Sequence, residues 1–351
     1  MKKHTLLLLL SLFAFLMSEA KIWRVNNNPE VQSDFKQLSE AMISPLVSHG
    51  DSIYLEGSPT TYNAATINKK IIIIGTGYFL TDIANEKTQW LKDPAKIQSL
   101  SFDQGSSGSK ASGLQITGTI DLNDTHLTIE RCYIENWLRL GDKPNTTADY
   151  DTIRQNFIYG INSREATSTA NNVLVYNNIF FSKGFNFSGN IDNTSIYAIN
   201  NTFLPDTKTG SVAFICRNVL FQNNIIQAPS MGASNLALNQ YYNNIISNTA
   251  FPSAGNNVQN TEMEQVFVNW NDGDQSPSEG FSKDNRFKLK AGSPGLKGGS
   301  INSTMIDCGA FGGSAPYVLS GMPPIPSIFS ADIPNLISTP TVNITLSIAS
   351  H

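Results

Sequence analysis

The fold is decided by a stretch in the middle of the chain, Val173-Leu174-Val175-Tyr176-Asn177-Asn178-Ile179-Phe180. Apolar residues alternate up to a pair of asparagines, and two more apolar residues follow the pair. The same order returns along the chain, with a cysteine in the second asparagine position of the earliest copy, at residues 127–134, 153–158, 196–203, 219–226 and 241–246. Short apolar alternation that is broken by Asn, Gly and Ser is typical of strands joined by turns.

The second asparagine of each copy recurs at a nearly constant interval of 20 to 23 residues. A period of this length with a small drift indicates a solenoid whose loops vary in length. Leucine-rich repeats share the period, but their L-x-x-L-x-L-x-x-N frame is absent, and helical repeats need longer units. We therefore predict an all-β protein built as a parallel β-helix, with one coil for each copy.

The asparagines have a structural reason to recur. Each coil must bend sharply between strands, and asparagine tolerates the left-handed backbone region better than other non-glycine residues. Stacked coils place equivalent residues ~4.8 Å apart, where side-chain amides can hydrogen-bond into a ladder. A polar binding stripe is the alternative interpretation, but a half-buried amide needs partners and the stacked neighbours supply them. The predicted structural ladder consists of Asn156, Asn178, Asn201, Asn224 and Asn244.

The beginning of the chain fits the same architecture. Residues 23–26 form a predicted first strand, residues 33–42 a short amphipathic helix, and Gly50–Gly57 a second strand. With the Asn-ended repeat, this order resembles the right-handed parallel β-helix proteins of the pectin-lyase-like superfamily, as secreted bacterial members without an assigned activity. The resemblance implies a single-stranded right-handed parallel β-helix, with the N-terminal helix as a cap over the open end of the core.

Three parts are expected along the chain. Two lysines, an apolar run over residues 6–17 and small residues before Lys21 predict a signal peptide at residues 1–20, too short to span a bilayer. Residues 21–325 form the predicted β-helix. Residues 326–351 form a tail, in which the alternation at 341–348 predicts a strand that folds back to shield the C-terminal end. The protein is accordingly expected to be secreted, extracellular or on the cell surface, with the periplasm as an alternative.

Irregular segments are expected at two places in the β-helix. Residues 81–112 contain Trp90, Pro94 and a Gly/Ser-rich stretch, which predict a loop excursion. Residues 251–284 lack the repeat. Beyond them, residues 286–313 resemble the closing coils of secreted β-helix proteins and are expected to close the shaft.

The superfamily includes polysaccharide lyases and glycoside hydrolases, so the resemblance raises the question of catalysis. Its polygalacturonase-like members carry the strings Asn-Thr-Asp, Asp-Asp, Gly-His-Gly and Arg-Ile-Lys, none of which occurs here. A hydrolase needs two carboxyl groups, and a lyase needs a base and a group that neutralises a uronate carboxylate. Solvated loop charges are the simpler interpretation of the weak catalytic candidates, which are Arg154, Arg164, Asp151 and Lys183.

Composition narrows the choice of partners. Charged residues make up 15% of the chain, and the formal net charge is −4. A mildly acidic protein without basic runs does not suit nucleic acid. No cofactor and no metal are predicted, because Asp272 and Asp274 resemble only a fragment of a Ca²⁺ loop. No segment after the signal peptide is long and apolar enough to span a membrane.

Two functions remain open at this point. The first is a secreted or cell-surface β-helix that binds carbohydrate or acts in adhesion, because exposed rings such as Trp137, Tyr159 and Tyr197 would suit sugar rings. Aromatic residues more often fill a core, which is the competing interpretation of these rings. The second function is a lyase or hydrolase acting on an acidic polysaccharide. The missing catalytic strings favour the first.

Overall fold

The structure is a computed structural model that describes residues 20–82, 84, 85, 88–163, 165–189, 192, 194–205, 207, 210–270, 277–333 and 344–350. The predicted signal peptide lies almost wholly outside these residues. Among the described residues, no helix combines the length and the apolar character that crossing a bilayer requires.

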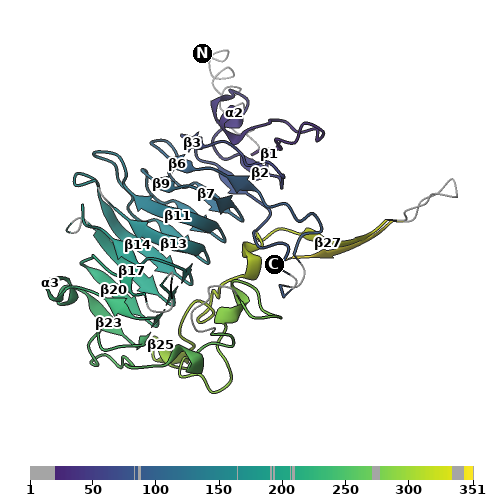
Figure 1. The fold of residues 1–351 in the computed structure, drawn as a ribbon. Helices are drawn as coiled ribbons and strands as arrows, with labels where there is room; N and C mark the ends of the chain where they lie inside the picture. The colour runs from purple at the N-terminus through teal and green to yellow at the C-terminus, as the bar shows by residue number, and fades with distance from the viewer. Residues whose placement is uncertain are drawn as a thin grey trace, which may run out of the picture.

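The chain coils into a parallel β-helix, as the repeat predicts (Figure 1). Its first face is a ten-stranded parallel sheet, here called sheet A, to which successive coils contribute one strand each. In order along the shaft, the strands are β1 (Ile22–Val25), β2 (Ser52–Leu55), β4 (Ile72–Ile74), β7 (Lys110–Ser112), β10 (Thr128–Glu130), β12 (Thr152–Arg154), β14 (Ala170–Tyr176), β17 (Thr194–Ile199), β20 (Val219–Gln222) and β23 (Gln240–Tyr242).

The other strands of the coils form a twelve-stranded sheet, here called sheet B, with two arms that meet in its two long strands. These are β11 (Tyr133–Leu140) and β13 (Phe157–Asn162). The first half of β11 pairs with one arm and its second half with the other, so each full coil has three faces.

One arm of sheet B holds β5 (Lys96–Ile97), β8 (Gln115–Ile116), β15 (Ile179–Phe180), β18 (Thr202–Phe203), β21 (Ile225–Ile226) and β24 (Ile245–Ile246). The other arm holds β3 (Ala65–Ile67), β6 (Leu100–Phe102), β9 (Ile120–Leu122) and β16 (Phe185–Asn186). A short parallel pair, β19 (Val212–Ala213) with β22 (Pro229–Ser230), lies in the later coils, and α3 (Ala233–Leu236) precedes β23.

The two members of each asparagine pair have different tasks. The first adopts a positive φ between 53° and 57° at Asn177, Asn200, Asn223 and Asn243, and makes the sharp bend between sheet A and sheet B. The second is fully buried and points into the shaft. In each of the five predicted ladder residues the side-chain amide nitrogen donates to the side-chain oxygen of the next rung, at 2.8 to 3.2 Å.

The ladder has one more rung than the repeat predicts. Asn244 donates to Asn257, whose own side-chain nitrogen is satisfied by the carbonyl oxygens of Tyr241, Pro252 and Ala254. The segment after residue 251 is therefore less irregular than expected, because it supplies the last rung of the ladder. At the opposite end, the backbone N–H of Cys132 donates to Asn156, so the cysteine copy ends the file.

The N-terminal cap is shorter than predicted. Helix α2 spans Leu38–Ile43, and its buried residues Leu38, Ala41 and Met42 join the core of the shaft. Residues 33–37 are not helical, because Phe35 instead bridges Val25 in parallel and packs its ring against Trp23. The cap therefore combines a six-residue helix with an extended segment.

The predicted loop excursion at residues 81–112 is also only partly right. Strands β5, β6 and β7 lie within that range and belong to the sheets. The Gly/Ser-rich stretch is a tight connection between β6 and β7, with Gly105 and Gly108 at positive φ. The excursion itself ends before β5.

The C-terminal third does not close the shaft. After Met263 the chain returns along the outside of sheet B toward the first coils, through the antiparallel hairpin β25 (Gly299–Ile301) and β26 (Thr304–Ile306) (Figure 1). Residues 293–326 are called the return segment below. The prediction that residues 286–313 close the shaft is wrong, because their apolar side chains cover the outer face of sheet B instead of the end of the core.

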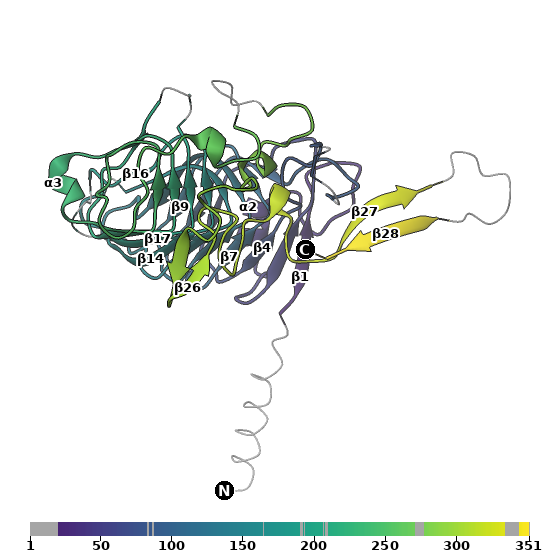
Figure 2. The ribbon, with the colours of Figure 1, turned by 90° about the horizontal axis from the view of Figure 1, so that it is seen from below.

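The tail does not shield the C-terminal end either. Strand β28 (Thr345–Ala349) pairs antiparallel with β27 (Ser327–Asp332), and this hairpin projects away from the shaft (Figure 2). Its base lies at the excursion before β5, where the N–H of Trp90 donates to the carbonyl of Ile328 at 2.7 Å. The predicted capping strand is therefore a strand of a protruding hairpin, which leaves residues 251–258 to end the coils.

Candidate functional site

The weak catalytic candidates lie in different parts of the shaft. Arg154 points outward from sheet A, where its Nη2 lies 2.5 Å from the carboxylate of Glu130 and its Nη1 lies 2.9 Å from the Tyr176 hydroxyl. Glu130 is 1% exposed and also pairs with Lys110. Burial alone would raise the pKa of Glu130, but hydrogen bonds and positive charges from Lys110 and Arg154 outweigh it and lower the pKa. Arg154 therefore stabilises a buried carboxylate.

Asp151 lies inside the shaft. It is fully buried, its Oδ1 accepts the backbone N–H of Leu127 at 2.7 Å, and its Oδ2 has no hydrogen-bond partner. Burial raises its pKa well above the usual value, since the hydrogen bond from Leu127 compensates only in part. A carboxyl group in this position does not reach a polysaccharide outside the shaft.

Lys183 lies on the outer face of sheet B, away from Arg154. Gly160 of the adjacent strand separates it from Trp137: a Cβ at position 160 would lie 2.7 Å from Lys183 Cβ and from Trp137 Cζ3. Glycine is therefore required where these side chains crowd together. Arg164 lies outside the described residues. Of the four candidates, the three that are described do not converge on one site.

A second apolar core lies outside the shaft, between sheet B and the chain that returns along it. Residues directly after the ladder positions point outward in one file, yet most of them are apolar and buried, including Phe157, Ile179, Ile225 and Ile245. They pack against side chains from the C-terminal third, among them Phe267, Phe287, Cys308, Ala310 and Tyr317. An outward face of this kind requires a cover, because it would otherwise expose a large apolar surface.

The residues with positive φ at the bends of the shaft also bind the return segment, which covers this outer face. The side-chain nitrogen of Asn177 donates to the carbonyls of Ala310 and Gly312, and that of Asn200 donates to Asp307. In earlier coils, Gln155 donates to Pro316 at 2.7 Å, and Arg131 donates to Met322 at 2.8 Å. The return segment is thus fixed coil by coil to the same bends that the asparagine pairs create.

A buried polar network completes the attachment near the first coils. Asp284 is fully buried and accepts hydrogen bonds from Asn85, Ser282, the backbone of Ser320 and the Tyr317 hydroxyl. This network joins the excursion before β5 to two parts of the C-terminal third that are far apart in sequence. Segments with fully satisfied buried polar groups have a well-defined position.

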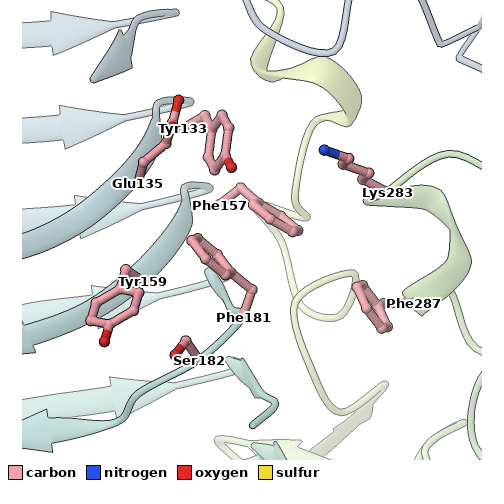
Figure 3. A pocket seen from close by; sticks show the side chains of 8 residues that line it. All are labelled: Tyr133, Glu135, Phe157, Tyr159, Phe181, Ser182, Lys283 and Phe287. Carbon is pink, nitrogen blue, oxygen red and sulfur yellow. The ribbon is translucent and has the colours of Figure 1, made fainter. Parts of the chain in front are cut away.

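A pocket of about 360 Å³ remains where the cover does not fill the space over β11, β13 and β15. Sheet B forms one wall and residues 283–287 form the other (Figure 3). This volume lies within the usual range for small-molecule sites, roughly 300–1,000 Å³. The lining residues are Tyr133, Glu135, Phe157, Tyr159, Phe181, Ser182, Lys283 and Phe287.

The wall on sheet B is a continuous group of aromatic rings. Phe157 and Phe181 are stacked with centroids 4.9 Å apart, and Tyr133 and Tyr159 contact this pair edge-on at 5.6 and 6.0 Å. Parallel pairing stacks the three coils that carry these rings. Tyr133 is in register with Phe157, and Phe157 is in register with Ile179, which lies two residues before Phe181. Trp137 extends the group beyond the pocket through an edge contact with Tyr159 at 5.2 Å.

Polar groups stand at defined places around the rings. Glu135 accepts a hydrogen bond of 2.6 Å from Gln115, and the Lys283 side chain points toward the aromatic wall from the opposite side (Figure 3). Ser182 is 2% exposed, and its hydroxyl has no hydrogen-bond partner. Burial raises the pKa of Tyr133 to about 12, with a smaller contribution from the charge of Glu135, so its hydroxyl stays neutral and can donate a hydrogen bond.

The pocket contains few ionisable side chains. Among the described lining residues, Glu135 supplies the one carboxyl group, whereas glycoside hydrolysis uses two. Nor do three His, Cys, Asp or Glu side chains come together as possible metal ligands anywhere in the part of the chain that the structure describes. Asp272 and Asp274 lie outside that part.

A second, smaller groove of about 240 Å³ lies on the outer face of sheet A. Tyr197, Leu220, Leu238 and Gln240 contribute to its lining. It belongs to the later coils, on a different face from the aromatic pocket. A ligand that binds aromatic and apolar surfaces could therefore bind in this groove instead of in the aromatic pocket.

The sequence analysis names one of the pocket rings but does not predict the pocket. Tyr159 belongs to the group of residues expected to suit sugars, whereas Phe157, Phe181, Glu135 and Lys283 were not predicted as a site. A signal was present, since the residue after each ladder position points outward and is apolar in most coils. That file predicts a covered outer face, although it does not identify the covering segment. Neither the protein-family models nor the curated proteins include a match to this chain.

Proposed function

We propose that this protein is a secreted carbohydrate-binding β-helix of the pectin-lyase-like superfamily, and that the aromatic pocket on sheet B holds the sugar. The observation that carries the proposal is the group of four rings, Tyr133, Phe157, Tyr159 and Phe181, at the wall of a 360 Å³ pocket. Sugar rings have apolar C–H faces that pack on aromatic rings, and hydroxyl groups that need polar partners at the edge.

The polar groups of the pocket match the second requirement. Glu135 can accept hydrogen bonds from sugar hydroxyls, and the neutral hydroxyl of Tyr133 and the ammonium group of Lys283 can donate them. The combination of an aromatic platform with both donors and acceptors favours a saccharide over a purely apolar ligand.

A polysaccharide lyase is the second candidate function, and one observation favours it. Lys283 faces the pocket and could neutralise a uronate carboxylate (Figure 3). A lyase also needs a base to remove a proton. Binding without cleavage is the simpler proposal, because the candidate bases Arg154 and Asp151 lie elsewhere.

A glycan array tests the proposal directly. The protein starting at Lys21 is applied to plant, algal and host oligosaccharides, together with Tyr159→Ala and the control Tyr150→Ala. Tyr150 is 56% exposed and stacks on His126, outside the pocket. Binding that Tyr159→Ala loses and Tyr150→Ala keeps supports the pocket, whereas silence across the array contradicts the proposal.

The same glycans separate binding from cleavage. A lyase product carries an unsaturated uronate that absorbs near-ultraviolet light. Incubation of the protein with each bound acidic polysaccharide, followed by absorbance, should give no increase. An increase that Lys283→Ala abolishes would favour the lyase alternative.

A further inference from the structure

The hairpin β27–β28 has one wholly apolar face. Cross-strand pairing places Ile328 opposite Ile348, and Ala331 opposite Leu346, so these four residues share a face. Strand alternation adds Ile333 and Ile344 at the far end of the hairpin. Ser330 with Ser347, and Asp332 with Thr345, form the opposite, polar face. Hence the hairpin is amphipathic, with a charge-free apolar side.

This apolar face is turned to solvent. The exposed fractions are 40% for Ile328, 54% for Ile333, 55% for Ile344, 48% for Leu346 and 62% for Ile348. On the other face, Ser330, Asp332 and Thr345 are exposed as well, and Ser347 and Ala349 are half-buried. Both faces of the hairpin therefore meet solvent, although one of them is apolar. The five aliphatic side chains form one exposed apolar patch, and contiguous patches of this kind are often interaction sites on soluble proteins.

The hairpin also needs support from outside itself. A two-stranded sheet is marginally stable in water unless a third strand or a packed face is added. The hairpin projects from the body, and among the described residues no other part of the chain lies over its apolar face (Figure 2). Its contact with the body is at its base, through Trp90.

We infer that the apolar face of β27–β28 is a dimer interface, which packs against the same face of a second copy of this chain. A second copy is self-complementary: related by a twofold axis, the two apolar faces bury each other and leave the polar faces outside. The hairpin projects from the body, so its apolar face is open to a second copy (Figure 2). This inference is independent of the sugar-binding pocket, which lies on sheet B.

The chemistry of the hairpin distinguishes this partner from a lipid surface. Segments that lie on membranes combine an apolar face with Lys, Arg and aromatic side chains at its border. The described residues of the hairpin strands include no Lys or Arg; their one charged side chain is the acidic Asp332, and their one aromatic side chain is Phe329. A neutral apolar face backed by serine and threonine instead suits packing against another sheet.

Light scattering after gel filtration tests the inference on the mature full-length protein, from about 5 to about 200 μM, the range expected for a small interface. Wild type should approach twice the monomer mass at the upper end. Leu346→Asp/Ile348→Asp should remain monomeric, because two charges enter the apolar face. The control Thr345→Asp/Ser347→Asp puts the same charges on the polar face of the same strand and should dimerise like wild type.

A milder variant covers the case in which the aspartates unfold the hairpin. Leu346→Ala/Ile348→Ala keeps the strand apolar but removes contact area, and should weaken dimerisation at least tenfold. A monomeric wild type at every concentration, or equal loss in the two aspartate variants, would overturn the inference. So would sedimentation with phosphatidylglycerol vesicles without self-association, since the face would then meet lipid.

Discussion

The side-chain nitrogen of Asn177 lies 2.8 Å from the carbonyl oxygen of Ala310, 133 residues further along the chain. The same nitrogen also donates to Gly312, while its neighbour Asn178 donates to Asn201 inside the shaft. Two adjacent asparagines thus face opposite ways: one stacks the coils, and the other binds the segment that covers them. The aromatic pocket exists because this cover leaves part of sheet B open.

Removing a central rung should destabilise the shaft. Asn201→Ala leaves the buried backbone N–H of Asn178 without its acceptor, and it removes the side-chain hydrogen bonds that Asn201 makes with the Asn178 amide and the Val175 carbonyl. An unsatisfied buried group costs about 1–3 kcal/mol and a lost hydrogen bond about 1 kcal/mol, so we expect a loss of about 3 kcal/mol in the free energy of unfolding. Urea unfolding followed by circular dichroism measures it. Asn63→Ala, at an exposed position, should change stability by less than about 0.5 kcal/mol; equal losses in the two variants would refute the ladder's role.

The outward-facing asparagine should act on the cover and not on the coils. Asn177→Gly keeps the left-handed φ of 55° accessible and removes the hydrogen bonds to Ala310 and Gly312. We expect faster hydrogen exchange in residues 307–317, with exchange in β14 and β17 unchanged. Asn218→Gly is the matched control, because Asn218 has a φ of 57° but is exposed at a bend away from the return segment. Unchanged exchange in residues 307–317 would contradict the assignment.

The buried carboxyl of Asp151 should make stability depend on pH. Its pKa is higher in the folded chain than the ~3.9 expected on unfolding. The folded state therefore binds its proton more tightly, and stability is fully present below pH ~4 and falls as the pH rises toward the folded pKa. Asp151→Asn keeps the acceptor for Leu127 and cannot ionise. It should equal wild type at pH 4 and be more stable at pH 8 in urea titrations; a gap that does not widen with pH would rule this out.

Lys283 should matter only for acidic ligands. Lys283→Gln removes the positive charge that faces the pocket while keeping a hydrogen-bond donor. A uronate-containing oligosaccharide should then bind about tenfold more weakly, the effect of roughly 1.4 kcal/mol, and its neutral counterpart should bind as before. Calorimetric titration at low and high salt measures both. Equal weakening for the two ligands would show that Lys283 acts through shape and not through charge.

The sequence contains enough to predict the shaft, but not its cover. The Asn-Asn pair recurs because every coil has the same bend, so one physical cause is visible many times, and the ladder from Asn156 to Asn244 follows. The contacts of Asn177 with Ala310 and of Gln155 with Pro316 occur once each and join segments without a shared period. Alternation at 341–348 predicts a strand, but it does not show whether the apolar side of that strand contacts the body of the protein.

The pocket is harder to predict from the sequence than either the shaft or the segment that covers it. Its rings come from three coils and stand in register only because the loops between the coils have the right lengths. In its other wall, Lys283 belongs to the stretch that lacks the repeat, and Phe287 to the part of the chain that resembles closing coils. The charged residues named as catalytic candidates also depend on contacts that a sequence does not show. Arg154 forms an ion pair with the buried Glu130, and the sequence alone does not reveal that this charge is already paired.

Hydrogen exchange of the mature protein, with and without a saturating oligosaccharide identified on the array, tests the central claim most directly. The pocket predicts slower exchange in the segments that line it, residues 133–137, 157–160, 181–183 and 283–287, and no change on sheet A. Slower exchange confined to residues 195–197, 218–220 and 238–240 would place the sugar in the other groove and contradict the account.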